Sequence, residues 1–321
     1  MGAIVFIYIG ADCLLSLLEK KRTPKGVTSV VFTEEGVAFA CIKEHKGQPE
    51  LSYCDFFPSR HPANEIDRFQ EYVASKELEA SQTVVVLPES AYQILLVERP
   101  DVPDAELVDA LRWRIKDLIN FDVENACIDY FDIPEDAYRG RSQMVYVVVA
   151  MQEQVEKWVT WCSDIHLQPM VVDVPELALL NLTEELADSE AGLAVFHVGQ
   201  QGSAINLLSD TSLYFTRQLS YKAGSNGGAA SSAVLELQRS LDYYESQVGK
   251  PPCIRLMVVP LQPDDSPLMN ELRENLPLDV HSLNLESLVS SSVPLPESLQ
   301  AHTTVAVSAA LRSVLSGGAV K

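Results

Sequence analysis

A chain of 321 residues in which 47% are hydrophobic and 21% charged has the composition of a folded globular protein, and it is long enough for two domains. Its formal net charge of −21 at pH 7 argues against nucleic acid as a partner, because phosphates would be repelled over the whole surface. A basic peptide is a more natural ligand for such a surface.

The six cysteines are scattered along the chain without a Cys-x-x-Cys pair, and no histidine lies at metal-ligand spacing from any of them. They are typical of small core residues in a reducing compartment. We therefore expect no metal site and no disulfide framework.

The first 26 residues form an apolar and basic segment. Its apolar run, residues 3–18, is shorter than the roughly 20 residues that a membrane-spanning helix needs, and Asp12 interrupts it. Basic residues follow this run, whereas a secretory signal has them before it. An interfacial anchor with a basic flank, a packed N-terminal element and residues upstream of the natural start all stay open.

Residues 27–87 have the pattern of three strands, a helix and a strand. Period-two alternation predicts a hairpin and a third strand, and apolar residues at helical spacing then predict a helix before a short apolar strand. The expected strands are residues 27–33, 36–42, 50–57 and 83–87, and the helix carries Ile66, Phe69, Tyr72 and Val73 on one face.

Residues 88–173 have their own order of strand, helix, two strands, helix and strand, which is typical of a small subdomain with a split βαβ pattern. The first helix, residues 104–119, is expected to bury Leu118 among its apolar residues and to be capped by Asp101. The strands are expected at 91–97, 127–133, 144–151 and 170–173, with the second helix at 153–163. A connecting helix at 174–186 has Pro175 in its first turn.

The order of the first unit returns in residues 174–321. Three strands in a meander are followed by a helix with Val234, Leu237, Leu241 and Tyr244 on one face, and then by an apolar strand. The expected strands are 193–198, 203–208, 212–219, 253–259 and 279–283, with further helices at 268–276 and 303–315. This repeat predicts a duplicated α/β domain with a cleft between its halves, and domain bounds of 27–87, 88–173 and 174–321.

Several motifs in this order resemble the PilM family of pilus assembly proteins. The principal one is Leu111-Arg-Trp-Arg-Ile-Lys-Asp-Leu-Ile-Asn-Phe-Asp122, followed by Ile128-Asp-Tyr130. Supporting matches lie at residues 171–179, 213–217, 237–243 and 304–312. The resemblance implies an α/β, actin-like (duplicated RNase H-like) two-lobed fold with a small α+β subdomain inserted in the first half. Members that serve mannose-sensitive haemagglutinin (MSHA) pili are the most similar, and the cytoplasmic part of type II secretion component L is a related alternative.

The resemblance also implies a location and a partner. Proteins of this family are cytoplasmic and are held at the inner membrane by the basic, apolar N-terminal tail of a PilN-type protein, next to the pilus assembly ATPase complex. The tail would lie between the first-half domain and the inserted subdomain, and we expect Pro88, Glu89, Tyr92 and Ile94 to form one wall of its groove. Direct membrane contact and a homodimer stay open.

The nucleotide site that the family implies departs from its usual pattern in the first two hairpins. The first hairpin normally combines Asp, Gly and a hydroxyl residue, but here it offers Thr33 and Glu34 with no Asp. In the second hairpin His197 stands where Asp is usual, and an imidazole does not bind magnesium as a carboxylate does. The residues left to approach a phosphate are Gly199, Gln200, Gln201 and Ser203.

The adenine-binding turn departs as well, because Pro260 and Pro263 replace the expected glycines and remove backbone donors. We therefore expect a degenerate nucleotide cleft in which ATP and magnesium are disfavoured, with no catalytic residues. The alternative is a functional actin-like ATPase whose motifs have drifted. Each residue also has a structural interpretation, since a histidine at a strand end is commonly a satisfied polar residue and glycines commonly serve hairpin turns.

Overall fold

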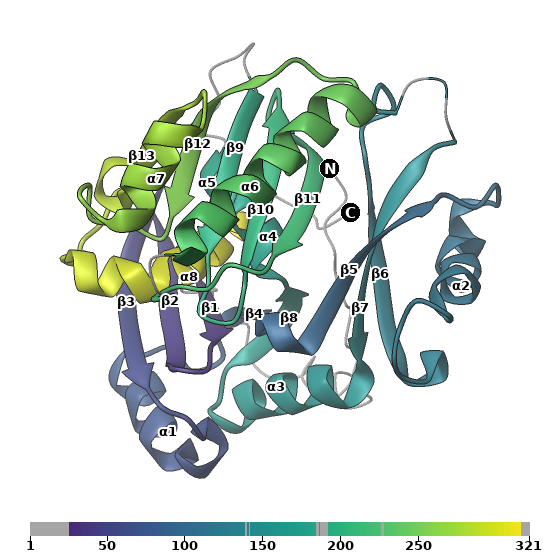
Figure 1. The fold of residues 1–321 in the computed structure, drawn as a ribbon. Coiled ribbons are helices and arrows are strands. Elements are labelled where there is room, and N and C mark those ends of the chain that lie inside the picture. The colour runs from purple at the N-terminus through teal and green to yellow at the C-terminus, as the bar shows by residue number, and fades with distance from the viewer. Residues whose placement is uncertain are drawn as a thin grey trace.

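The computed structural model describes residues 26–138, 140, 142–183, 186, 192–225 and 228–315, and it folds into two lobes with a small additional layer (Figure 1). The apolar and basic segment predicted for residues 1–26 lies outside the described residues except for Gly26. In the part of the chain that is described, no helix is both long and apolar enough to cross a membrane.

The first lobe is a five-stranded sheet in the order β3-β2-β1-β4-β8. Its first three strands form an antiparallel meander, and β4 and β8 then add in parallel. The strands are β1 (Val27–Phe32), β2 (Gly36–His45), β3 (Gln48–Pro58), β4 (Gln82–Val86) and β8 (Gln168–Asp173). Every residue of β1 is buried, which explains its continuous apolar and small-residue sequence at the centre of the sheet.

The second lobe repeats this topology in the order β11-β10-β9-β12-β13. Again three antiparallel strands are followed by two parallel ones. The strands are β9 (Gly192–Val198), β10 (Ser203–Ser209), β11 (Ser212–Leu219), β12 (Cys253–Val259) and β13 (Asp279–Ser282). The duplication predicted from the sequence is therefore confirmed, and the fold is of the actin-like, two-lobed class.

Helices cover both sheets on their outer faces, and a further helical layer lies between the sheets (Figure 1). The outer helices are α1 (Ile66–Ser75) and α3 (Gln152–Asp164) on the first sheet, and α6 (Gly228–Tyr243) and α7 (Pro267–Asn275) on the second. The inner layer consists of α4 (Pro175–Ala178), α5 (Leu180–Thr183) and α8 (Glu297–Leu315). The single connecting helix predicted at 174–186 is thus two short helices.

Helix α8 follows the last strand of the second lobe in sequence but packs on β1, β2 and β3 of the first lobe. Small buried residues such as Ala306 and Ala310 allow this close approach, and the Ser29 hydroxyl of β1 donates a hydrogen bond to the Ala306 carbonyl at 2.6 Å. Near its end, Arg312 forms an ion pair with Asp173 at the end of β8. The sequence placed this helix with the second half and did not reveal its contact with the first sheet.

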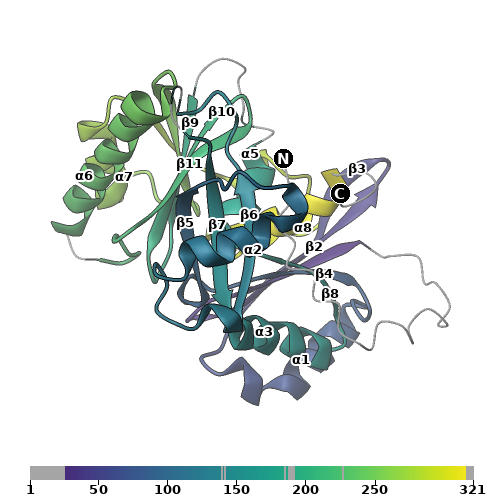
Figure 2. The same ribbon diagram turned by 90° about the vertical axis from the view of Figure 1, so that its right-hand side faces the viewer.

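A separate three-stranded sheet in the order β5-β7-β6 forms the additional layer (Figure 2). It comprises β5 (Tyr92–Glu98), β6 (Ala126–Asp132) and β7 (Met144–Met151), and α2 (Asp104–Ile115) packs on one face. Leu107, Leu111 and Ile115 of α2 are fully buried against that face, as the sequence predicts.

Three details of the sequence-based description of this region are wrong. Leu118 is 55% exposed because α2 ends at Ile115, and the N-cap of α2 is Pro103, so Asp101 does not cap it. The split βαβ arrangement is also not present, because α3 packs beside β8 and β8 pairs with β4 in the first-lobe sheet. This sheet membership favours an insert that ends near Met151, although the domain bounds themselves stay a proposal.

Candidate functional site between the two lobes

A cavity of about 210 Å³ lies between the lobes, at the position of the cleft that the sequence predicts. Its walls come from the turn after β1, the segment after β4, the end of β9 with the turn that follows, the turn after β12, and α8. Six predicted nucleotide-site residues line it together: Thr33, Glu34, His197, Gly199, Gln200 and Gln201. Ser203 is not among its lining residues, because that side chain is buried and donates its hydroxyl to the Tyr221 carbonyl at 2.9 Å.

The first hairpin turn uses its polar groups internally. The Thr33 hydroxyl donates to the Gly36 carbonyl at 3.0 Å and accepts from the Gly36 amide at 3.1 Å. A Cβ on Gly36 would lie 2.0 Å from the Phe57 carbonyl oxygen, so this glycine permits close approach of β3. The hydroxyl and the glycine that the family pattern assigns to phosphate binding therefore serve the hairpin itself.

The second hairpin turn contains a carboxylate from the other lobe. Glu89, which follows β4, reaches across the cleft, and a Cβ added to Gly199 would lie 2.3 Å from its Oε1 atom. The Gly202 backbone N–H donates a hydrogen bond to this carboxylate and stabilises its charged form. An anion of the chain itself thus occupies the turn that would face a phosphate. The sequence analysis assigned Glu89 to a peptide groove, and no sequence signal indicated that it crosses the cleft.

Glu89 faces His197 across the cavity, with 3.6 Å between Glu89 Oε1 and His197 Nδ1. Burial raises the pKa of Glu89 to about 7, helped by the nearby charge of Glu176 and opposed by the Gly202 N–H and by Lys222. Burial also lowers the pKa of His197 to about 4, so the imidazole is neutral at pH 7. Within the described residues, Glu89 Oε2 and His197 Nδ1 are buried without a hydrogen-bond partner.

The outer mouth of the cleft is acidic. Glu34 and Glu35 of the first hairpin face Gln200 and Gln201 of the second across a wider space, and Arg60 also borders this opening. Farther in, His302 lies 3.4 Å from Glu35. Among the residues that the structure describes, no group of three or more His, Cys, Asp or Glu side chains is arranged to hold a metal ion.

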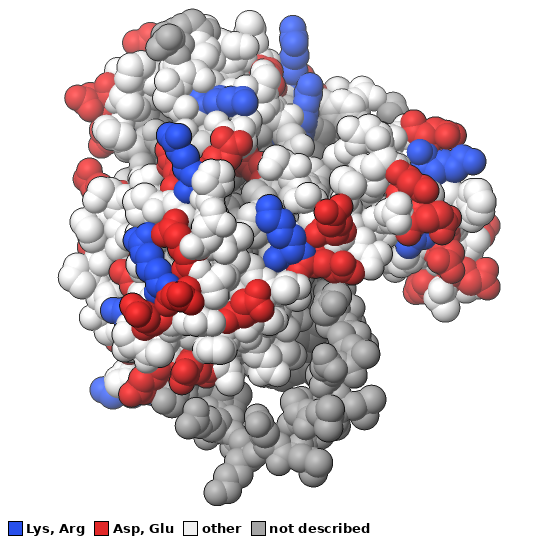
Figure 3. Space-filling view, turned by 90° about the horizontal axis from the view of Figure 1, so that it is seen from below, with Lys and Arg blue, Asp and Glu red and all other residues white. Residues whose placement is uncertain are grey.

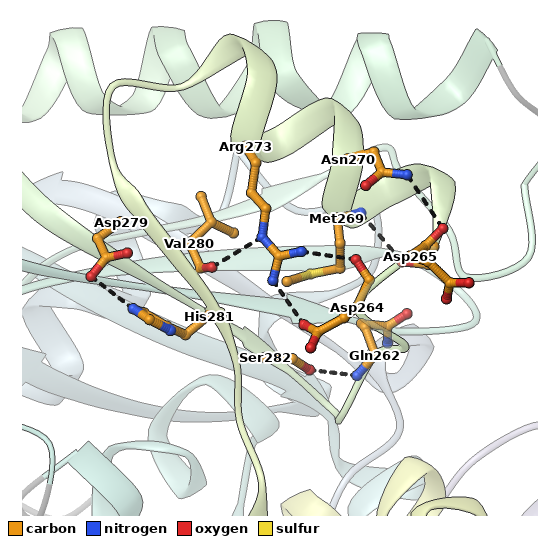
Figure 4. Close-up of polar contacts among 11 residues, drawn as sticks. Gln262, Asp264, Asp265, Met269, Asn270, Arg273, Asp279, Val280, His281 and Ser282 are labelled. Atoms are coloured by element: carbon orange, nitrogen blue, oxygen red, sulfur yellow. Dashed lines mark hydrogen bonds and ion pairs between the residues drawn. The ribbon is translucent and has the colours of Figure 1, made fainter.

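The turn after β12 is fixed by polar contacts with Arg273 of α7 (Figure 4). Its guanidinium donates to the Asp264 carbonyl and to Asp264 Oδ1, each at 2.8 Å, and its Nε–H donates to the Val280 carbonyl at 3.4 Å. The Gln262 backbone N–H donates to Ser282 Oγ at 2.5 Å. Pro260 and Gln262 remain as cavity lining, so side chains occupy the side where the family places adenine.

The four residues predicted to form one wall of a peptide groove lie in different places. Pro88 and Glu89 line the interlobe cavity. Tyr92 is buried and donates its hydroxyl to Glu176 Oε2 at 2.5 Å. Ile94 borders a second groove of about 340 Å³ between β5 and β11, together with Leu96, Tyr146, Phe215, Thr216, Arg217 and Gln218.

Buried polar contacts fix the insert to the second lobe. Gln218 donates to Glu176 Oε1 at 3.1 Å, so Glu176 joins β5 to β11 through Tyr92 and Gln218. The Tyr146 hydroxyl of β7 donates to the Thr216 carbonyl at 3.2 Å and accepts from the Thr216 amide at 3.1 Å. The sequence reasoning did not single out Glu176 or Tyr146, because nothing in a strand pattern shows which strands of two different sheets meet.

Comparison with known proteins shows which family and which solved structures the chain resembles. The family model described as "Type IV pilus assembly protein PilM" matches residues 63–244. A solved PilM chain from the "PilM-PilN type IV pilus biogenesis complex" is similar in structure, with 19% sequence identity, a TM-score of 0.72, and coverage of 91% of this chain and 99% of that chain. No curated protein sequence matches the chain.

More distant structures share the fold. The cytoplasmic domain of EpsL, an inner-membrane component of the type II secretion system of Vibrio cholerae, has 12% identity and a TM-score of 0.51, with 91% of this chain and 95% of that chain covered. A protein of unknown function with an actin-like ATPase fold from Bacteroides thetaiotaomicron has 11% identity and a TM-score of 0.52, with 84% and 93% covered. Because the family model covers more than half of the sequence, the chain belongs to the PilM family of type IV pilus assembly proteins.

Proposed function

We propose that this protein is a cytoplasmic adaptor of the inner-membrane platform that assembles a type IV pilus, and that it holds the basic N-terminal tail of a PilN-type membrane protein. The observation that carries this proposal is the structural similarity to nearly the whole length of a PilM chain solved in complex with PilN. The net charge of −21 supports a basic ligand.

The groove between β5 and β11 is the best candidate for the tail. Each of these strands is at the edge of its sheet, since β5 pairs with β7 and β11 with β10 in the described part of the chain. Ile94, Leu96 and Phe215 contribute apolar surface to the groove. An extended peptide with alternating apolar and basic residues fits such a groove through its apolar side chains. At Thr216 the backbone N–H and carbonyl of β11 are already bonded to the Tyr146 hydroxyl, so the apolar contacts rather than strand pairing at that residue carry the fit.

Substitution of Ile94 by lysine is expected to weaken binding of a synthetic basic, apolar PilN-type tail peptide by at least tenfold, because a charge would then repel the peptide from an apolar groove. Fluorescence anisotropy at 50 and 300 mM NaCl measures this, and binding to the unsubstituted protein should weaken with salt. Ile254→Lys is the matched control, because Ile254 is 56% exposed on a different part of the surface. Absence of peptide binding at low salt would contradict the adaptor function, and equal binding by Ile94→Lys would contradict the groove.

We further propose that the cleft between the lobes is a degenerate nucleotide site that does not bind Mg-ATP. The Glu89 carboxylate takes the Gly202 N–H, and the Thr33 hydroxyl is engaged within its own turn. An ionised Glu89 repels a phosphate in this turn, and because its pKa is about 7 this repulsion is fully present only above pH 7.

Titration of the protein with Mg-ATP in a calorimeter is therefore expected to give no saturable heat at ligand concentrations up to about 1 mM. The heat of dilution of Mg-ATP into buffer is the control. A micromolar dissociation constant would contradict the proposal and would favour the alternative of a functional ATPase.

At a finer level, we propose that the pilus is of the MSHA type and that the chain corresponds to the MshI branch of the family. The motif at residues 111–122, followed by residues 128–130, supports this assignment. Restored assembly of MSHA pili in cells that lack their own PilM-like protein would test it, and failure of a stably expressed chain to restore assembly would contradict it.

A further inference from the structure

The interlobe cavity contains polar groups that none of its own neighbours satisfies. His197 is only 9% exposed, lines the cavity and points its Nδ1 atom toward Glu89. In the described residues this Nδ1 atom and Glu89 Oε2 both lack hydrogen-bond partners. Buried polar atoms in native proteins are nearly always paired, so two unpaired atoms of facing residues indicate a place where a ligand forms hydrogen bonds. Glu89 Oε2 accepts from such a ligand when ionised, and His197 Nδ1 accepts in the tautomer that carries its proton on Nε2.

The charged groups around the cavity indicate whether the ligand that donates these hydrogen bonds is an anion or a cation. Glu89 lies at its floor with Lys222 nearby, and Glu34 and Glu35 outnumber Arg60 at its mouth. The glutamine side chains at the mouth accept as well as donate hydrogen bonds. An anion meets repulsion at each of these carboxylates, whereas a cation with several N–H groups finds acceptors at the floor and attraction along the entrance.

The walls and the size of the cavity limit the ligand further. Apolar surface from Val31, Leu87, Val198 and Val305 surrounds the polar floor. The inner cavity of about 210 Å³ suits a single long side chain or a small amine. Alkyl guanidinium and alkyl ammonium groups combine an apolar stem with a cationic, donor-rich end, as this cavity requires.

We propose that the cleft between the lobes is a binding site for one alkyl guanidinium or ammonium group, which donates hydrogen bonds to Glu89 and to His197. The Gly202 N–H stabilises the charged form of the acceptor carboxylate. The guanidinium class is the better match, because its planar fork presents several donors to the two acceptor atoms at once.

Arginine amide is the probe, and citrulline amide is its neutral counterpart of nearly the same shape. Calorimetry at pH 8, together with backbone amide shifts of Gly199 and Gly202 in ¹⁵N-TROSY spectra, is expected to show saturable binding of arginine amide below about 1 mM. Citrulline amide should bind at least tenfold more weakly. No saturable shift with arginine amide, or equal binding of the two probes, would overturn the proposal.

Substitution of Glu89 by glutamine should weaken arginine amide binding at least tenfold, because the charge is lost while the shape is kept. Glu286→Gln is the matched control, since Glu286 is exposed and outside the cavity lining. Thermal denaturation confirms that each variant is folded. Equal affinity in Glu89→Gln would overturn the site, as would stronger binding of inorganic phosphate than of arginine amide to the unsubstituted protein.

The cation has two possible sources, a free amine or a basic residue of a bound peptide. Competition by arginine amide against the tail peptide in the Ile94→Lys variant separates them, because the proposed peptide groove is then blocked. Residual, displaceable peptide binding assigns the cation to the peptide, and binding of arginine amide alone assigns it to a free amine. Failure of the peptide to bind contradicts only the proposed adaptor function, whereas failure of arginine amide contradicts only this site.

Discussion

Replacement of Arg312 by alanine is expected to lower the free energy of unfolding by about 3–5 kcal/mol, because it leaves a buried carboxylate without its cation. The Asp173 side chain is fully buried, and Arg312 of α8 forms an ion pair with it. Burial raises the pKa of Asp173, and the attraction of Arg312 opposes that rise. Urea denaturation at pH 7.5, followed by tryptophan fluorescence and circular dichroism, measures the loss.

The loss should shrink as the pH falls toward 5. Without Arg312 the pKa of Asp173 rises further, so the folded variant takes up a proton and the buried charge disappears. Arg114→Ala is the matched control, because the Arg114–Glu98 pair is nearly half-exposed on both sides and is expected to contribute less than 1 kcal/mol. Equal destabilisation by the two substitutions would contradict the importance of the buried pair.

Substitution of Glu89 by glutamine is expected to stabilise the protein by about 3 kcal/mol at pH 8 and by much less at pH 5. The folded state raises the pKa of Glu89 from 4.5 to about 7, and each pH unit corresponds to about 1.4 kcal/mol. Between pH 4.5 and pH 7 the folded state holds a proton on Glu89 that the unfolded state has released. The contribution of Glu89 to stability therefore falls as the pH rises from 4.5 to 7 and is constant above that range.

Other charged groups near Glu89 influence its pKa. Glu176 raises the pKa of Glu89, and Lys222 lowers it. The pKa of His197 falls from 6.5 to about 4 on burial, so the contribution of His197 is lost as the pH falls through that interval. For this reason the quantity to measure is the difference between Glu89→Gln and the unsubstituted protein at each pH. Glu34→Gln at the exposed mouth is the control, and a pH-independent difference for Glu89→Gln would contradict the assignment.

The order of the strands along the chain was predictable because alternating or continuous apolar residues mark each strand in the sequence. Runs such as residues 27–32 and 193–198 are mostly apolar and buried throughout, and polar turns separate them from their antiparallel partners. Since both meanders are followed by a helix and an apolar strand, the duplication was also visible. The cleft between the lobes followed from that duplication.

The contacts between distant segments were not predictable in this way. Helix α8 has an apolar and small-residue face that would fit either sheet, and its bond from Ser29 to Ala306 joins residues 277 positions apart. Strand β8 alternates between exposed and half-buried residues in its first half, so nothing in its pattern assigned it to β4. The position of Glu89 beside a glycine turn of the other lobe was not predictable for the same reason.

The distribution of charge on the surface was also not predictable from the sequence. A net charge of −21 predicts an acidic surface but not its distribution. On the face seen from below in Figure 3, acidic side chains are spread over the molecule with basic ones between them, and they do not form one continuous patch. The acidic character that matters for a ligand is therefore local, as at Glu34, Glu35 and Glu89 around the cleft.

The return of α8 to the first sheet has a consequence for synthesis on the ribosome. Residues 27–86 leave the exit tunnel long before residues 297–315 are translated, so the inner face of their sheet must wait uncovered for most of the elongation time. Closure of such a distant contact also slows folding. During that interval the nascent chain presents an apolar sheet face, and the first lobe is completed only after the last helix has been made.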